Sequence, residues 1–151
     1  MRLDEIRPQF ILVMGGAGSG KNHYISQNYP DFKLIDIDEE KLSMPISVAI
    51  SSIKPMLTSA FESGANVAHP TTGTNLEAQH NKIRLAKKYG YTVTLVLIDT
   101  APAKAIGQVR DRVQQGGHDV PIEKIVTSNN AARDNFETLR HIADKSKVIS
   151  N

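Results

Sequence analysis

The residues best suited to chemistry lie in a glycine-rich stretch near the start of the chain, FILVMGGAGSGK, which runs from Phe10 to Lys21. Gly15, four further residues, Gly20 and Lys21 have the spacing of a phosphate-binding loop, or P-loop. Glycines let backbone N–H groups turn toward phosphate oxygens where side chains would block the approach. The lysine adds a mobile positive charge that reaches the β- and γ-phosphates. The stretch therefore predicts a nucleotide-binding site, the alternative being a glycine-rich turn with a surface lysine.

The neighbours of this loop support the prediction and add one departure. The apolar run Phe10–Met14 indicates a short buried strand, and the helix expected after it points its N-terminal dipole at the same anion. A dinucleotide-binding loop of the pattern G-x-G-x-x-G does not fit, because Lys21 occupies the position where that pattern requires its third glycine. Asn22 stands where the pattern has a Ser or Thr hydroxyl for Mg²⁺, although its carbonyl oxygen can also ligate. We expect ATP or GTP, with Mg²⁺, to contact Gly15, Gly16, Ala17, Gly18, Ser19, Gly20, Lys21, Asn22 and His23.

Strand and helix patterns alternate along the rest of the chain. Strands are expected at Phe10–Met14, Phe32–Ile37, Asn66–His69, Thr92–Ile98 and Lys147–Ser150. Helices are expected at Lys21–Asn28, Ile46–Ser63, Leu76–Tyr89, Ala103–Gln115 and Ile122–Ala143. Pro55 predicts a kink or a break in the second helix. This alternation indicates an α/β domain with a parallel sheet, whose binding residues lie at the carboxyl ends of the strands.

Carboxylates follow two of the predicted strands. A kinase that acts on a hydroxyl needs a carboxylate to orient the hydroxyl and accept its proton, and Asp38 is the candidate for this role. The alternative for Asp38 is a helix N-cap. Asp36 is expected to support the loop or Lys21, and to lie near the substrate. Asp99 resembles a Walker-B aspartate that helps to hold Mg²⁺, or else caps the next helix.

Hydroxyl and amide side chains follow the third predicted strand. Thr72, Thr74 and Asn75 can contact the substrate, although for each residue alone a helix cap is the favoured interpretation. These three residues complete the polar groups that the sequence places at the carboxyl ends of the strands.

Two arginines precede the segment GGHDVP, a glycine-hinged break of the kind found in mobile lids. Arg110 and Arg112 are two residues apart, so a helix cannot aim both at one point. One can stabilise charge on the transferred phosphoryl group while the other holds the lid, the alternative being a solvated helix face. His118 within the break is expected to be structural or to contact base or phosphate, rather than to act as a general base.

Length and composition limit the class of protein. The 151 residues fit one domain, residues 1–151, and the 40% apolar and 23% charged content is ordinary for a globular chain. A net charge of +2 does not by itself indicate nucleic acid. The lack of cysteine excludes disulfides and suits a reducing cytosol. With no signal-peptide core or membrane-length apolar run, we expect a soluble cytoplasmic domain without a membrane partner. No feature fixes its oligomeric state.

Taken together, these segments resemble the P-loop kinases grouped around the zeta toxins, with the kinase domain of phage polynucleotide kinase as a relative. GGAGSGK is similar to their phosphate loop, and LIDID to the strand that ends at their catalytic aspartate, which falls on Asp38. Lys41 falls where the phage kinase has a substrate-binding arginine. TGTNLE and the strand YTVTLVLID are similar to their third-strand segment and the strand after it, and the segment Gln108–Ile125 is similar to their lid.

The resemblance covers Phe10 to about Ile149. It implies a three-layer α/β fold with sheet order 2-3-1-4-5 and a short lid. It also implies transfer of a γ-phosphoryl group from ATP or GTP to a hydroxyl of a nucleotide-sugar, a nucleoside or a 5′-hydroxyl nucleic acid.

The sequence departs from the relatives in three ways. Asn22 replaces the hydroxyl, and the stretch KIVTSNNAARDN in the helix after the lid keeps only Arg133, where relatives often carry several arginines. The sequence also stops just after the last predicted strand, without the final helix of longer relatives. These departures leave open a nucleotide-binding regulatory module with impaired transfer. A nucleic-acid-binding protein is a weak third reading, because no basic stripe with interleaved aromatic residues is present.

Overall fold

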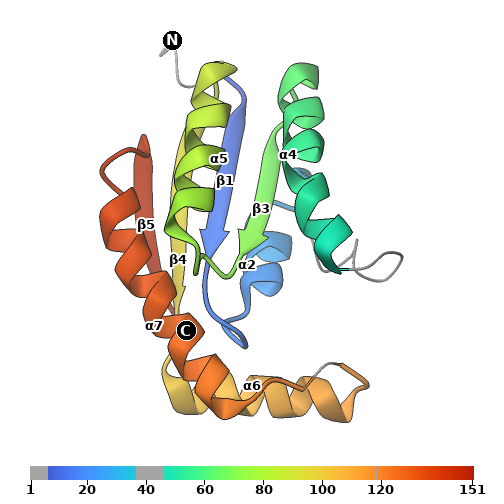
Figure 1. The fold of residues 1–151 in the computed structure, drawn as a ribbon, viewed down its shortest axis with the longest axis vertical. Helices are drawn as coiled ribbons and strands as arrows, with labels where there is room; N and C mark the ends of the chain where they lie inside the picture. The colour runs from blue at the N-terminus through green and yellow to red at the C-terminus, as the bar shows by residue number, and fades with distance from the viewer. Residues whose placement is uncertain (1–6, 37–45, 118) are drawn as a thin grey trace.

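The structure is a computed structural model that describes residues 7–36, 46–117 and 119–151 (Figure 1). Its strands are β1 (Gln9–Met14), β2 (Lys33–Leu34), β3 (Val67–Thr71), β4 (Thr92–Asp99) and β5 (Lys145–Ser150). Its helices are α2 (Lys21–Asn28), α4 (Ile46–Ser63), α5 (Leu76–Lys88), α6 (Pro102–Gln114) and α7 (Ile122–Leu139). The predicted helices therefore agree with the structure to within one residue at both ends, except at the end of α7.

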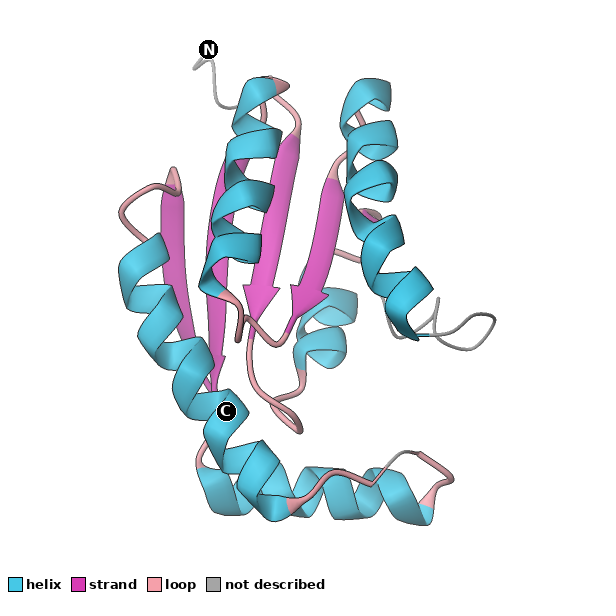
Figure 2. Ribbon diagram, viewed as in Figure 1, coloured by secondary structure: helices cyan, strands magenta, loops and turns pink. Residues whose placement is uncertain are grey.

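The strands form one parallel sheet in the order β2-β3-β1-β4-β5, which confirms the expected fold class and strand order. β1 lies between β3 and β4, with Phe10 opposite Val67 on one side and Val93 on the other. Helices α4, α5 and α7 cover one face of the sheet, and α2 lies against the other (Figure 2). The chain is therefore a three-layer α/β domain.

The core is divided between the two faces, as the period of two along a strand requires. Phe10, Leu12 and Met14 of β1 pack toward α4, α5 and α7, while Ile11 and Val13 pack toward α2. All five side chains are at most 1% exposed. A strand buried on both faces reads as a continuous apolar run, which is why β1 and β4 stand out in the sequence.

Two predicted elements are shorter in the structure than the sequence indicates. β2 covers only Lys33–Leu34, because it is an edge strand that pairs with β3 alone before the chain continues to Asp36. α7 ends at Leu139 instead of Ala143, because the chain must turn to reach β5, where the backbone N–H of Asp144 already donates to the Val93 carbonyl. Tertiary pairing sets both of these ends.

Proline interrupts neither β3 nor α4. β3 continues through Pro70 to Thr71, beyond the predicted end at His69. The carbonyl oxygen of Ala68 accepts from the backbone N–H of Ile35, so the backbone polar groups of Ala68 point toward β2. The backbone nitrogen of Pro70, two residues further along β3, points to the same side but lies beyond the end of β2. The missing N–H of the proline therefore costs no hydrogen bond of the sheet.

The helix α4 continues through Pro55 without the predicted break. Ile53 and Leu57, on either side of the proline, are buried in the core and hold the helix in place.

The helix α6 lies across the end of the molecule to which the strand arrows point, and α7 leads back from it along the sheet (Figure 1). Ala105 and Val109 of α6 pack against Ile125 of α7, which fixes the angle between the two helices. The predicted lid segment therefore lies at the carboxyl ends of the strands. Within the described ranges, no helix is both long and apolar enough to cross a membrane.

Candidate functional site

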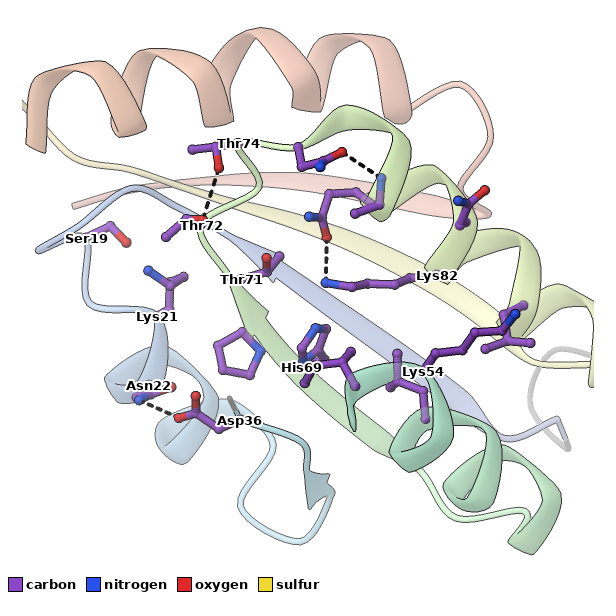
Figure 3. A pocket seen from close by; sticks show the side chains of 18 of the residues that line it. Ser19, Lys21, Asn22, Asp36, Lys54, His69, Thr71, Thr72, Thr74 and Lys82 are labelled. Carbon is purple, nitrogen blue, oxygen red and sulfur yellow. Dashed lines mark hydrogen bonds between the residues drawn. The ribbon is translucent and has the colours of Figure 1, made fainter. Parts of the chain in front are cut away.

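A cavity of about 1220 Å³ opens at the carboxyl ends of β1 and β3. One wall is the second half of the glycine-rich loop with the start of α2, and the opposite wall is formed by α4, α5 and the residues after β3 (Figure 3). The volume exceeds the range of roughly 300–1,000 Å³ typical of a pocket for one small ligand. The cavity therefore has room for two small ligands side by side.

Two glycines of the loop that line this cavity adopt a left-handed backbone conformation. Gly18 has φ 76° and Gly20 has φ 89°, both in the left-handed region. A Cβ on Gly18 would lie 2.3 Å from the carbonyl oxygen of Ala105, so only glycine fits. Both glycines line the cavity, and no group in the described part of the chain accepts a hydrogen bond from their backbone N–H groups. Gly20 is also the N-cap of α2 and provides no side-chain cap, which leaves the N-terminus of the helix open to an anion.

The outer side of the loop is held by side chains distant in sequence. Ser128 Oγ accepts from the backbone N–H of Ala17, and Asn129 Nδ2 donates to the Ala17 carbonyl, each at 3.1 Å. Thr100 Oγ1 donates to the Ser19 carbonyl at 3.1 Å. These contacts fix the curvature of the loop from α7 and from the end of β4. The sequence gives no signal for the contacts from α7, because more than a hundred residues separate the partners.

Lys21 and Asn22 begin α2 at the floor of the cavity. Lys21 Nζ donates to the Gly15 carbonyl at 2.8 Å and to the Gly16 carbonyl at 3.3 Å, so its charge lies within the curve of the loop. Asn22 Nδ2 donates to Asp36 Oδ2 at 3.0 Å. The Asp36 side chain is nearly buried, at 6% exposure. The structure thus brings together a lysine, an amide and a carboxylate beside the loop amides.

The residues predicted to hold Mg²⁺ do not lie together. Asn22 Oδ1 and Asp36 line the cavity, and oxygen ligands of this kind suit Mg²⁺. Asp99 is not part of the cavity lining, and Arg133 donates to its Oδ1 from Nε at 3.2 Å and from Nη2 at 2.7 Å. Asp99 also does not cap α6, whose N-cap is Ala101. No group of three His, Asp or Glu residues with metal-binding geometry occurs in the ranges that the structure describes.

The predicted substrate residues after β3 do line the opposite wall. Thr72 Oγ1 and Thr74 Oγ1 are 3.5 Å apart, and both face the cavity. Asn75 also lines it, while its Oδ1 accepts from the backbone N–H of Ala78 at 3.0 Å as the N-cap of α5. Asn75 therefore has the capping role and still lies at the site.

The two lid arginines are separated, as their spacing requires. Arg112 lines the cavity, whereas Arg110 is exposed and lies outside the lining. His23 lines the cavity from α2. Asp38, Lys41 and His118 lie outside the described residues.

Several cavity residues on α4 and α5 were not among the predicted site residues. Lys54, Lys82, Arg84 and Lys88 add positive charge to the wall opposite the loop. A signal was present, because LEAQHNKIRLAKK carries four basic side chains against one glutamate. Periodicity identified this segment as a helix without showing which of its faces meets the site.

The core histidine in the middle of β3, His69, is neutral. Nδ1 of His69 lies 2.6 Å from the Ile35 carbonyl oxygen, and because a carbonyl can only accept, Nδ1 carries the proton. Nε2 is therefore an acceptor, and it is buried without a partner in the described part of the chain. Burial, together with the nearby charge of Lys82, lowers the pKa of His69 to about 3. His69 cannot act as an acid–base group near neutral pH.

The sheet order, the loop between β1 and α2, and the helix across the strand ends together define a P-loop kinase fold. The family described as zeta toxin matches residues 28–151. The chain belongs to the zeta toxin family.

Solved structures give the same result for the fold. A chain of the PezAT toxin–antitoxin system of Streptococcus pneumoniae superposes with a TM-score of 0.76 at 21% identity, over 97% of this chain and 69% of that one. A chain of the Pnkp1/Rnl/Hen1 RNA repair complex superposes with a TM-score of 0.74 at 15% identity, over 87% of this chain and 46% of that one. A chain of the AvrRxo1-ORF1:-ORF2 complex with ATP superposes with a TM-score of 0.70 at 16% identity, over 99% of this chain and 58% of that one. No curated protein matches the sequence significantly.

Proposed function

We propose that this protein is a cytoplasmic kinase that transfers the γ-phosphoryl group of ATP or GTP to a hydroxyl of a nucleotide-sugar, a nucleoside or a 5′-hydroxyl nucleic acid. The observation that carries this proposal is a single cavity with the loop amides and Lys21 on one wall and hydroxyl and cationic side chains on the other (Figure 3). Membership of the zeta toxin family and the likeness to a structure solved with ATP support the nucleotide.

The phosphates would be held by groups of three kinds. The backbone N–H groups of Gly18 and Gly20 donate to phosphate oxygens, and the open N-terminus of α2 favours the negative charge. Lys21 exchanges the two loop carbonyls for the β- and γ-phosphates. Arg112, the lid arginine that lines the cavity, stabilises charge on the transferred group.

In the transfer step, the acceptor oxygen forms a bond to the γ-phosphorus while the bond from that phosphorus to the β–γ bridging oxygen breaks. The nucleoside diphosphate leaves, and the hydroxyl proton passes to a carboxylate. By its resemblance to the family pattern, Asp38 is the proposed base. Asn22 Oδ1 and Asp36 would hold Mg²⁺, which neutralises phosphate charge when bound.

Calorimetry with ATP and GTP, with and without Mg²⁺, tests the nucleotide site. We expect micromolar affinity, about −8 kcal/mol, for the wild type. Lys21→Ala should weaken it by about tenfold or more, because it removes a charged hydrogen-bond donor. Lys87→Ala, which removes an exposed lysine outside the cavity, is the matched control. A radiolabelled γ-phosphate screen over UDP-sugars, nucleosides and 5′-hydroxyl oligonucleotides then seeks the acceptor. If neither nucleotide binds, the proposal fails.

A second candidate function is a nucleotide-binding regulatory module with impaired transfer. The hydrogen bond from Asn22 to Asp36 favours it, because the side chain at the usual Mg²⁺ position is engaged with a carboxylate. Asn22→Ser supplies the hydroxyl that P-loops normally have. Phosphoryl transfer that rises at least tenfold in this variant at unchanged ATP affinity would support the second function, and equal rates would support the first.

A further inference from the structure

Two side chains at neighbouring strand ends donate to one carbonyl oxygen of the glycine-rich loop. Thr100 directly follows β4 and Asn151 directly follows β5, and the sheet register pairs the last residues of these two strands. Thr100 Oγ1 donates to the Ser19 carbonyl oxygen at 3.1 Å, and Asn151 Nδ2 donates to the same oxygen at 2.8 Å. A carbonyl oxygen has two lone pairs, so these two donors, which we call the Ser19 clamp, satisfy it fully.

The side chain of Asn151 is held in one orientation. Its backbone N–H donates to the Asp99 carbonyl at 3.0 Å, which keeps the residue in the register of the sheet. Lys104 Nζ, near the start of α6, donates to Asn151 Oδ1 at 2.8 Å. An ammonium group can only donate and a carbonyl can only accept, so the amide of Asn151 satisfies both neighbours in one orientation alone. Thr100, the other donor, is fully buried, at 0% exposure.

The direction of the Ser19 carbonyl determines the direction of the next backbone N–H. The peptide bond between Ser19 and Gly20 is trans, and in a planar trans peptide the C=O and the N–H point in opposite directions. The Ser19 clamp therefore turns the Gly20 N–H away from the ends of β4 and β5. Neither Thr100 nor Asn151 lines the cavity, whereas Gly20 does. In the described part of the chain, no group accepts from the Gly20 N–H.

The loop repeats this arrangement two residues earlier. Asn129 Nδ2 donates to the Ala17 carbonyl at 3.1 Å, and the N–H of the same peptide belongs to Gly18. Gly18 also lines the cavity, and within the described ranges its N–H has no acceptor. Side-chain donors thus hold alternate carbonyls of the loop from outside the cavity. Donors that are already oriented before a ligand arrives give higher affinity, because little order must be imposed on binding.

We propose that Thr100 and Asn151 are positioning residues that aim the Gly20 N–H at a phosphate oxygen of the nucleotide. The nucleotide rests on the proposed kinase function, whereas the Ser19 clamp rests on the contacts described above. Neither side chain touches the ligand, and both act through the peptide between Ser19 and Gly20. Position 20 accommodates the clamp because it is a glycine, since a Cβ there would lie 3.1 Å from Asn151 Nδ2.

Calorimetry with ATP and with inorganic triphosphate tests the positioning role. Thr100→Val and Asn151→Ala should each weaken both ligands about three- to tenfold, the usual effect of one hydrogen bond. The double variant should lose more than the product of the single losses, because only then does the Ser19 carbonyl lack any donor. Thr100→Ser keeps the hydroxyl and should bind like the wild type.

Asn66→Ala is the matched control for Asn151→Ala. Asn66 Oδ1 accepts from the backbone N–H of Gln9 at 2.9 Å, at the opposite end of the sheet, so this variant also loses one asparagine hydrogen bond. It should bind ATP and triphosphate like the wild type. If the clamp variants, singly and together, bind both ligands as tightly as Asn66→Ala does, the inference is overturned. Loss of affinity for ATP but not for triphosphate also overturns it, because the two residues would then contact the nucleoside.

NMR of the Gly20 backbone amide in ¹⁵N-labelled protein separates positioning from a merely structural role. In the wild type, triphosphate should move this signal saturably as the N–H becomes a donor. In the ligand-free double variant the signal should broaden, because the unclamped peptide exchanges between orientations on the μs–ms timescale. A structural role would lower the free energy of unfolding in urea while leaving the Gly20 signal and the triphosphate affinity unchanged.

Failure of this inference and failure of the kinase proposal give different results. A wild type that binds neither ATP nor triphosphate refutes the kinase, and broadening of the Gly20 signal in the double variant would still support the Ser19 clamp. Normal ATP binding by the wild type and by every clamp variant refutes the inference alone.

Discussion

Replacing Gly18 by alanine tests whether the shape of the loop depends on a glycine at this position. Its φ of 76° is in the region that L-residues avoid. A Cβ there would also lie 2.3 Å from the backbone carbonyl oxygen of Ala105 in α6. Because this neighbour is backbone in a packed helix, it cannot rotate away as a side chain could. Gly18→Ala therefore carries both a conformational cost and a steric cost.

Gly64 provides a control that separates the two costs. Its φ of 77° is nearly the same, but no atom lies within 4 Å of the position that a Cβ would take. Gly64→Ala should lower the free energy of unfolding by about 1–2 kcal/mol, the cost of the left-handed backbone conformation. Gly18→Ala should lower it by about 1–3 kcal/mol more, the usual range for overpacking.

Urea unfolding of the wild type and both variants measures these values, and calorimetry with ATP measures the consequence for the site. We expect ATP affinity to fall in Gly18→Ala, since the loop amides must move with the backbone, and to remain normal in Gly64→Ala. If Gly18→Ala is no less stable than Gly64→Ala, the contact with α6 does not shape the loop and the steric argument is refuted.

Three further predictions concern single side chains. Asn75→Ala should lower the free energy of unfolding by about 1 kcal/mol in urea denaturation, because the 3.0 Å cap to Ala78 is lost. Arg133→Met should change it by less than about 1 kcal/mol, because both partners in the pair with Asp99 are more than a third exposed, at 42% and 37%. In the unfolded chain His69 takes up a proton below about pH 6.5, whereas in the folded chain it does so only near pH 3. The free energy of unfolding should therefore fall as the pH falls from about 6.5 to 3, by up to about 1.4 kcal/mol per pH unit. Urea unfolding at several pH values should show a shallower fall for His69→Gln, and an equal fall would contradict the burial argument.

The sequence alone was sufficient wherever a local signal determined the structure. Helix α2 ends before Pro30, α4 ends before Gly64, and α5 begins after its Asn75 cap, because these residues act on their own neighbours. The spacing of the glycine-rich loop likewise predicted a phosphate site without reference to any distant residue. Strong apolar runs predicted β1 and β4, since a strand covered on both faces has no alternation to conceal it.

Only the tertiary structure decided which side chains meet at the cavity. The sheet order placed α5 beside the loop, and the burial of its apolar face turned Lys82 and Gln79 toward the site. The same packing separated Arg112 from Arg110 and engaged Asp99 with Arg133 instead of leaving it as a free Mg²⁺ ligand. Such outcomes depend on contacts between residues far apart in the chain, which a local pattern does not encode. Local chemistry therefore identified the glycine-rich loop, whereas long-range packing fixed the curvature of that loop and determined which side chains form the opposite wall of the cavity.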